Sequence, residues 1–378
     1  MALIVVAAGL LTAALNGSAT AAVGLVSPVD GSRVHVGGPG LLIDPNTRVP
    51  GLVARKTPRS DLSVRRDPNA TATVDRLEAD LHAAHDARAA ANVVVAAILG
   101  LLALLAIGSR SPPAARAAVL YAPAAIGLGL AWRSALAIGF GALVPAVAAA
   151  VSRRAFKPLL VAFFGAALLF LWHWPVTNAL ATIGPHPDGG HRFYGVTNQV
   201  ETMLLAPALV AGLAAAPFAL VAVGWSKAGA DGGGLLVYAT GYAVTLLQRF
   251  GRVTRRRAVL AAAAVVAFGI VLVAVDAATG GSSHVTHSLG TGLPGDLAHR
   301  LNVSYHGVTR SVGAFAMFAF GAALLALVVR VRNRPPLVNA MLVALAVSFL
   351  VNDTPTDVAL WGALGALTVL GFERARVG

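Results

Sequence analysis

Two carboxylates stand where apolar segments begin or end, and both are candidates for acid–base chemistry. Asp353 lies in VNDTPTD, a short turn between two apolar runs, and Glu201 opens the apolar run that follows HRFYGVTNQ. A carboxylate positioned beside a reacting group can accept its proton. The alternative role for Glu201 is that of a favourable negative charge at a helix N-terminus. The sequence therefore predicts Asp353 and Glu201 as candidate catalytic residues, and Arg192, Lys227 or Arg300 as natural partners of Asp353.

Basic, amide and aromatic side chains share these polar stretches and could bind a ligand. Arginine and lysine would attract an anion, and the glycines of SKAGADGGG could present backbone amides to it. Asp231 has the alternative role of capping the following helix, and Arg192 and Tyr194 that of interface anchors. The candidate substrate-binding residues, suited to an anionic or hydroxylated headgroup, are Arg192, Tyr194, Asn198, Lys227, Asp231, His287, Arg300 and Asn352.

Metal and covalent chemistry find less support in the sequence. His284 and His287 are three residues apart, but no motif fixes a third ligand near them, so we predict no metal site and no cofactor. Solvated histidines in a turn-rich loop are the alternative. The chain has no cysteine, which excludes a thiolate nucleophile, a disulfide and a cysteine-ligated zinc. Nucleophile-elbow and HExxH motifs do not occur, and no dinucleotide glycine fingerprint begins a βαβ unit.

The composition indicates that membrane helices position these residues. Hydrophobic residues make up 57% and charged residues 12% of the chain, against about 25% charged in a soluble domain. The net charge of +13 is better explained by position than by nucleic-acid binding, because basic residues collect in cytoplasmic loops. We therefore expect an all-α polytopic membrane protein with about 9–10 transmembrane helices, whose partner is the lipid bilayer and not nucleic acid.

Ten apolar runs follow residue 91, and most are long enough to cross a hydrocarbon core of about 30 Å. They cover residues 92–108, 117–132, 135–151, 158–174, 200–223, 233–247, 259–275, 312–329, 337–351 and 358–372. Five basic clusters lie between or after them, at residues 110–116, 153–157, 249–257, 330–334 and 374–376.

If all five basic clusters face the cytoplasm, the chain must cross the membrane an even number of times between one cluster and the next. Three apolar runs lie between Lys157 and Arg249, so one of them must not cross the membrane. The run with Pro207, Gly212 and Pro217 is the candidate, and we expect a broken, re-entrant hairpin over residues 200–226. Broken helices of this kind often line binding sites. The alternative is a single kinked span with five arginines on the outer side. The hairpin places the polar stretches on the extracytoplasmic face and the C-terminus in the cytoplasm.

The N-terminal part has a different composition. Residues 1–21 fit a signal peptide or an N-terminal anchor, because the first apolar run covers only about fifteen residues. Residues 22–90 are rich in Pro, Gly, Asp and Arg and predict a small extracytoplasmic α+β segment, with a strand over Ala22–Val26 and a helix over Thr73–Ala91. Residues 91–378 form the expected multi-pass domain.

Several of these motifs resemble those of a family of uncharacterised bacterial multi-pass membrane proteins. RFYGVTNQ, GADGGG, VTHSLG followed by HRL, and VNDT are similar to that family's RFYGxGN, GxDxGG, THLG and ND motifs, over roughly residues 90–378. Thr197 departs from the pattern, since a glycine is usual there. Larger members carry an alkaline-phosphatase-like domain, and GPGLLIDPNTRVPGLVA is similar to its closing segment. The resemblance implies a bacterial plasma-membrane location and a phosphatase remnant that has no room for the metal ligands or the nucleophile.

Three functions fit these features. The first is a cell-envelope enzyme acting at the outer leaflet on a lipid-linked glycan or phospholipid-type substrate, because candidate bases and anion-binding side chains share one face. The second is a transporter or flippase, because half-helices meet at the expected hairpin. The third is a non-catalytic envelope scaffold or partner subunit. The sequence leaves the oligomeric state open.

Overall fold

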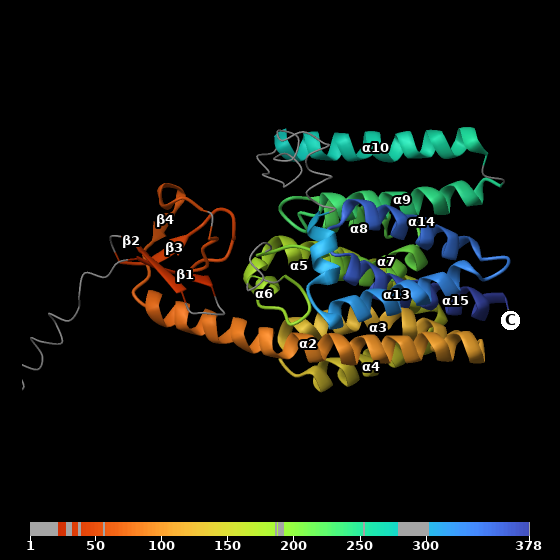
Figure 1. Cartoon of the computed structure of the whole chain (residues 1–378), viewed down its shortest axis with the longest axis horizontal. Helices are drawn as coiled ribbons and strands as arrows, with labels where there is room; N and C mark the ends of the chain where they lie inside the picture. The colour runs from red at the N-terminus through yellow and green to blue at the C-terminus, as the bar shows by residue number, and fades with distance from the viewer. Residues whose placement is uncertain are drawn as a thin grey trace, which may run out of the picture. The chain divides into compact units, whose positions relative to one another are not determined.

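The computed structural model describes residues 22–27, 32–36, 39–55, 57–185, 187, 193–251, 254–278 and 302–377, and Figure 1 shows the chain. The chain divides into two compact units. The first comprises Met1–Asp86 and His186–Phe193, and the second comprises Ala87–Pro185 and Tyr194–Gly378. The expected signal or anchor at residues 1–21 lies outside the described residues.

The first unit contains a four-stranded sheet in the order β2-β1-β3-β4. The strands are β1 (Ala22–Ser27), β2 (Ser32–Val36), β3 (Leu41–Ile43) and β4 (Ser63–Arg65), with a 3-10 turn, η1 (Arg59–Asp61), before β4. β1 pairs antiparallel with β2 and parallel with β3. The strand expected at Ala22–Val26 is confirmed, and it supplies Ala22 to a small core with Leu42 and Val53.

A buried aspartate organises the loop after β3. Asp44 is 1% exposed, and its carboxylate accepts hydrogen bonds from the backbone amides of Asn46 and Ala54 and from the Thr57 hydroxyl, at 2.8, 2.8 and 2.7 Å. Thr47, in the same loop, donates to the carbonyl of Leu52 at 2.8 Å. The DPNT sequence therefore forms a closed turn held by its own polar side chains.

Ion pairs attach β2 to helix α2 (Ala70–Ser109) within the first unit. Arg33 Nη2 lies 2.5 Å from Glu78 Oε2 and 2.7 Å from Asp75 Oδ1. The hydrogen bonds to Glu78 and then Asp75 raise the pKa of Arg33 above its ordinary value. The guanidinium therefore joins the sheet to the first turns of α2.

Helix α2 is a single helix of 40 residues, about 60 Å long at 1.5 Å per residue. The sequence predicted a helix over Thr73–Ala91 and a separate apolar run from Asn92 to Gly108. The structure joins them, because no glycine or proline interrupts the chain between Ala70 and Leu99 and alanine favours helix throughout. The change from polar to apolar composition near residue 91 therefore occurs inside one helix.

The second unit is helical. Its helices are α3 (Pro112–Ala131), α4 (Ala135–Val151), α5 (Arg153–His173), α6 (Pro175–Ala179), α7 (Asn198–Ala211), α8 (Ala216–Gly224), α9 (Gly232–Arg249), α10 (Arg255–Ala278), α13 (Val312–Val329), α14 (Pro336–Val351) and α15 (Pro355–Val377). Serine side chains cap several of them, as Ser111 caps α3 and Ser311 caps α13. α7 and α15 are the most buried and form the centre of the core.

Five helices of the described residues are long and apolar enough to cross a membrane by length and composition: α2, α3, α5, α13 and α15. Two shorter helices, α4 and α14, are also apolar. Large apolar side chains such as Val144 and Phe320 are exposed on their surfaces. The unit is thus a helix bundle whose outside is apolar.

The apolar run at residues 200–223 is broken into two half-helices. α7 ends at Gly212, which has a φ of 81°, and Pro217 lies in the first turn of α8. At 1.5 Å per residue, the 14 residues of α7 and the 9 of α8 extend about 21 and 14 Å, less than the roughly 30 Å hydrocarbon core. The amide of Val196 donates to the carbonyl of Gly229 at 2.9 Å. The chain therefore leaves the hairpin at the end of the bundle where it entered.

The two ends of the bundle differ in charge. Gly233 at the start of α9 lies against Asn352 at the end of α14, so the other ends of these two helices lie at the opposite end of the bundle (Figure 1). Arg249 ends α9, and Arg334 shortly precedes α14. A Cβ on Gly212 would lie 4.0 Å from Arg249 Nη2, which places the tip of the hairpin near this basic end. Carboxylates and amides gather at the end where the hairpin opens.

Candidate functional site

A polar network occupies the end of the bundle where the α7–α8 hairpin opens. Its side chains come from the start of α7, the start of α9, the end of α14 and the turn before α15. We call it the hairpin-mouth network, and it comprises Asn198, Glu201, Asp231, Ser348, Asn352, Asp353 and Thr354. Helix ends converge here, and they bring unsatisfied backbone groups as well as side chains.

Asn198 joins α7 to the turn between α14 and α15. Its amide nitrogen donates to Asp353 Oδ1 at 2.9 Å and to Thr354 Oγ1 at 3.0 Å. Asp353 is exposed and Asn198 is half-buried, so a ligand at the surface can reach both. Within the described part of the chain, Asp353 makes no ion pair with Lys227, one of the cations expected beside it. Its partner is an amide because Asn198 begins α7 directly opposite the turn.

Glu201 lies one turn deeper in α7 and is 0% exposed. The amide nitrogen of Asn352 donates to Glu201 Oε2 and to Ser348 Oγ, both at 2.8 Å. Burying a carboxylate is costly unless polar groups solvate it, and an amide donor supplies part of that solvation. Glu201 also lies in the first turn of α7, where the helix dipole favours a negative charge.

The glycine-rich start of α9 closes over this carboxylate. Asp231 caps α9 as predicted, accepting from the Gly234 amide at 3.0 Å. A Cβ on Gly234 would come within 3.0 Å of Glu201 Cγ and 3.1 Å of Asp231 Cγ. A Cβ on Gly233 would come within 2.8 Å of Asn352 Oδ1. The glycines of GADGGG therefore provide room for the two acidic side chains and the amide to approach one another.

Two tyrosines on α9 attach it to the hairpin below the network. Tyr238, 0% exposed, donates to the carbonyl of Glu201 at 2.9 Å, and Tyr242 donates to the carbonyl of Ala208 at 3.2 Å. The two hydroxyls lie one helical turn apart on one face of α9. These two hydrogen bonds fix the position of α7 along α9, and so fix how deeply Glu201 is buried in the bundle.

The loops beside the network are closely packed. Gly195 has a φ of 88°, and a Cβ there would lie 2.1 Å from the carbonyl oxygen of Gly229. The side-chain amide of Asn178, just after α5, donates to the carbonyl of Gly195 at 3.0 Å. The segment from Tyr194 to Thr197 therefore leads into α7 through a turn at Gly195 that only glycine fits.

The structure brings together five of the residues singled out in the sequence, namely Asn198, Glu201, Asp231, Asn352 and Asp353. Tyr194 and Lys227 are half-buried in the segments that flank the network, next to Gly195 and before Ala228. The other three candidates, Arg192, His287 and Arg300, lie outside the described residues. Among the residues that the structure describes, no three His, Cys, Asp or Glu side chains are grouped so that they could hold a metal ion.

Some polar residues at this end of the bundle were not predicted from the sequence. Gln199 donates to Asn92 Oδ1 at 2.7 Å and so links α7 to α2. Ser348 precedes Asn352 by four residues, a spacing that places both on one face of α14 and that could have indicated a polar face. Asn178 follows the WHW stretch in a short helix that no apolar periodicity marks.

No protein-family model matches the chain, and neither a curated protein nor a solved structure shows a significant similarity to it.

Proposed function

We propose that the chain is an integral membrane protein whose α7–α8 hairpin re-enters the bilayer from the extracytoplasmic side. Its basic clusters would then face the cytoplasm, in agreement with the positive-inside rule. Three tryptophans support this arrangement, because they lie near helix ends at the same end of the bundle as the hairpin-mouth network. Trp132, Trp172 and Trp174 are 41%, 46% and 54% exposed there. Tryptophan is enriched at that depth in membrane proteins.

We further propose that the hairpin-mouth network binds a hydroxylated or anionic headgroup, and that the protein is a cell-envelope enzyme acting on a lipid-linked glycan or phospholipid-type substrate. The observation that carries this proposal is the 2.9 Å hydrogen bond between Asn198 and Asp353, residues 155 positions apart. This hydrogen bond brings the start of α7 and the VNDT turn together at a position that a ligand can reach. Such positioning of an amide and a carboxylate suits headgroup binding and proton transfer.

The two carboxylates take different roles in this proposal. Asp353 is exposed and would act as the base that contacts the substrate. Glu201 is 0% exposed and would orient Asn352 through the 2.8 Å hydrogen bond, as a positioning residue. Asn352 in turn adjoins Asp353 in the chain. Arg192, Lys227, His287 and Arg300 remain proposed headgroup contacts.

A transporter or flippase is the second candidate, because two half-helices meeting at a hairpin are typical of transport sites. Against it, α7 is apolar from Met203 to Ala211 and every one of these residues is buried. Transport sites usually lie near the bilayer midplane, whereas the polar network is within about one turn of the helix ends. This position favours chemistry at the membrane surface.

The proposal is tested in a strain that lacks the protein and is complemented with variants. Asp353→Asn should fail to restore the envelope lipid composition of the wild type, as measured by lipid mass spectrometry, although it reaches the membrane in normal amount. Asn339→Ala, at the basic end of α14, should restore it and serves as the control. Normal lipid chemistry with Asp353→Asn would argue against the enzyme. A change only in the leaflet that a lipid occupies would favour the flippase.

A further inference from the structure

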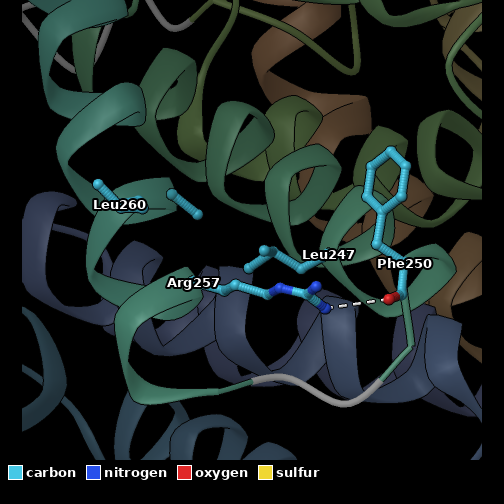
Figure 2. A pocket seen from close by; sticks show the side chains of 5 residues that line it. Leu247, Phe250, Arg257 and Leu260 are labelled. Carbon is cyan, nitrogen blue, oxygen red and sulfur yellow. Dashed lines mark hydrogen bonds between the residues drawn. The ribbon is translucent and has the colours of Figure 1, made fainter.

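A second candidate site lies at the basic end of the bundle, away from the hairpin-mouth network. A shallow cavity of about 430 Å³, wide open to the surroundings, lies between the end of α9 and the start of α10. It is lined by Leu247, Phe250, Arg257, Leu260 and Ala261 (Figure 2). Four apolar residues and one guanidinium make a wall suited to an amphiphile with a negative head.

The guanidinium of Arg257 is held at the cavity by a backbone contact. Its Nη1 donates to the carbonyl oxygen of Phe250 at 3.0 Å, and Figure 2 shows the side chain extended toward that carbonyl. Phe250 is the C-terminal cap of α9, so the cation also lies at the negative end of the helix dipole. The charge of Arg257, an exposed residue, is therefore positioned beside the apolar wall.

The surrounding charges favour an anionic occupant. Residues 249–257 contain five arginines and no acid, and Arg249, Arg255 and Arg256 are exposed beside Arg257. Three of these arginines occupy the first turn of α10, where the helix dipole disfavours positive charge. A bound anion would relieve the repulsion among them and oppose the unfavourable dipole.

The apolar part of the cavity favours a lipid over a free anion. Phe250 and Leu260 are 68% and 59% exposed, although each contributes to the cavity wall. Such exposed apolar surface is stable when acyl chains cover it. Basic pockets between transmembrane helices on the cytoplasmic side bind anionic lipid headgroups.

We propose that this cavity binds an anionic phospholipid of the inner leaflet, with its phosphate at Arg257 and its acyl chain against Leu247, Leu260 and Ala261. The inference rests on the proposed membrane orientation but not on the chemistry of the hairpin-mouth network. Occupancy would brace α10 against α9 at the basic end.

The test is native mass spectrometry of the detergent-purified full chain, titrated with phosphatidylglycerol or with phosphatidylcholine of the same acyl chains. The wild type should bind the first phosphatidylglycerol about five-fold more tightly, as expected for one arginine near a lipid phosphate. Arg257→Gln should remove this difference. Arg374→Gln, which changes an exposed arginine of α15 that does not line the cavity, should keep it. Ala261→Phe should fill the cavity and weaken both lipids.

Three results would overturn the proposal. Equal binding of the two lipids by the wild type would remove the anion preference. An equal loss of that preference with Arg257→Gln and Arg374→Gln would mean that positive charge acts without a defined site. Inorganic phosphate that binds as tightly as phosphatidylglycerol would assign the site to a free anion. Asp353→Asn should bind phosphatidylglycerol normally, so failure at this cavity is distinguishable from failure of the proposed enzyme site. Thermal unfolding of each variant verifies that it is folded.

Discussion

The side-chain amide of Asn352 donates a 2.8 Å hydrogen bond to the buried carboxylate of Glu201, and this contact joins the end of α14 to the first turn of α7. Asn352 is 5% exposed and Glu201 0% exposed, so water does not readily replace either partner. The bond fixes the position of the residue that precedes Asp353. The rigidity of the hairpin-mouth network therefore depends on the buried Asn352–Glu201 pair rather than on the accessible Asn198 and Asp353.

Asn352→Ala should destabilise the bundle by about 1–3 kcal/mol, because it removes a buried donor from a carboxylate and from Ser348. Thermal unfolding of the purified protein in detergent measures the effect. The double variant Glu201→Gln, Asn352→Ala should lose less than the sum of the two single changes. Strict additivity would contradict a direct interaction between the two side chains.

Gly195→Ala and Gly229→Ala should each destabilise the protein by about 1–3 kcal/mol through overpacking. A Cβ on Gly195 would lie 2.1 Å from the Gly229 carbonyl oxygen, and one on Gly229 would lie 2.3 Å from the carbonyl oxygens of Ala222 and Val223. Gly127 is the matched control, because a Cβ there meets nothing within 4 Å. If Gly127→Ala lowers the unfolding temperature as much as the other two, the close approach at the hairpin mouth is wrong.

Tyr238→Phe and Tyr242→Phe should each cost about 0.5–1.5 kcal/mol, because each removes one buried hydrogen bond to a carbonyl of α7. Tyr305 is 65% exposed, and Tyr305→Phe supplies the control. Hydrogen exchange of the α7 amides should accelerate in Tyr238→Phe and stay unchanged in Tyr305→Phe. Unaltered exchange in both would show that the hydroxyls do not hold the hairpin.

Asp44→Ala should destabilise the first unit by about 2–3 kcal/mol, since its carboxylate accepts three hydrogen bonds that close the loop after β3. Hydrogen exchange of the β1 and β3 amides in the full chain reports on this unit. Asp61→Ala, at an exposed position, should leave that exchange unchanged. Protection of β1 equal to that of the wild type in Asp44→Ala would argue against this role.

The sequence predicted the elements whose physical signals are local. Asp231 was expected to cap α9 and does, because a helix N-terminus selects short acceptor side chains. The break at Gly212 follows from Pro207, Gly212 and Pro217, which oppose a continuous helix. The continuity of α2 was missed, because a change of composition near residue 91 resembles a boundary although the helix propensity does not change.

Contacts between distant segments were harder to predict. Convergence of the RFYG, GADGGG and VNDT stretches was expected from charge placement, but the pairing of Asn198 with Asp353 and of Asn352 with Glu201 depends on helix packing. Of the three cations expected beside Asp353, Arg192 and Arg300 lie outside the described residues, and among the described side chains it is the Asn198 amide that donates to Asp353. Charge patterns indicate which end of a bundle a residue occupies, whereas the partner is set by which helix ends meet.

The central claim is that both ends of the α7–α8 hairpin and the turn after α14 face the outside, opposite the arginines between α9 and α10. Because the chain has no cysteine, single cysteines can be placed at Lys227, Asp353 and Arg256 and tested in intact cells with a membrane-impermeant maleimide. Lys227→Cys and Asp353→Cys should label in intact cells, and Arg256→Cys only after permeabilisation. Labelling of Arg256→Cys in intact cells, with Lys227→Cys labelled only after permeabilisation, would contradict the re-entrant hairpin and with it the proposed outward-facing site.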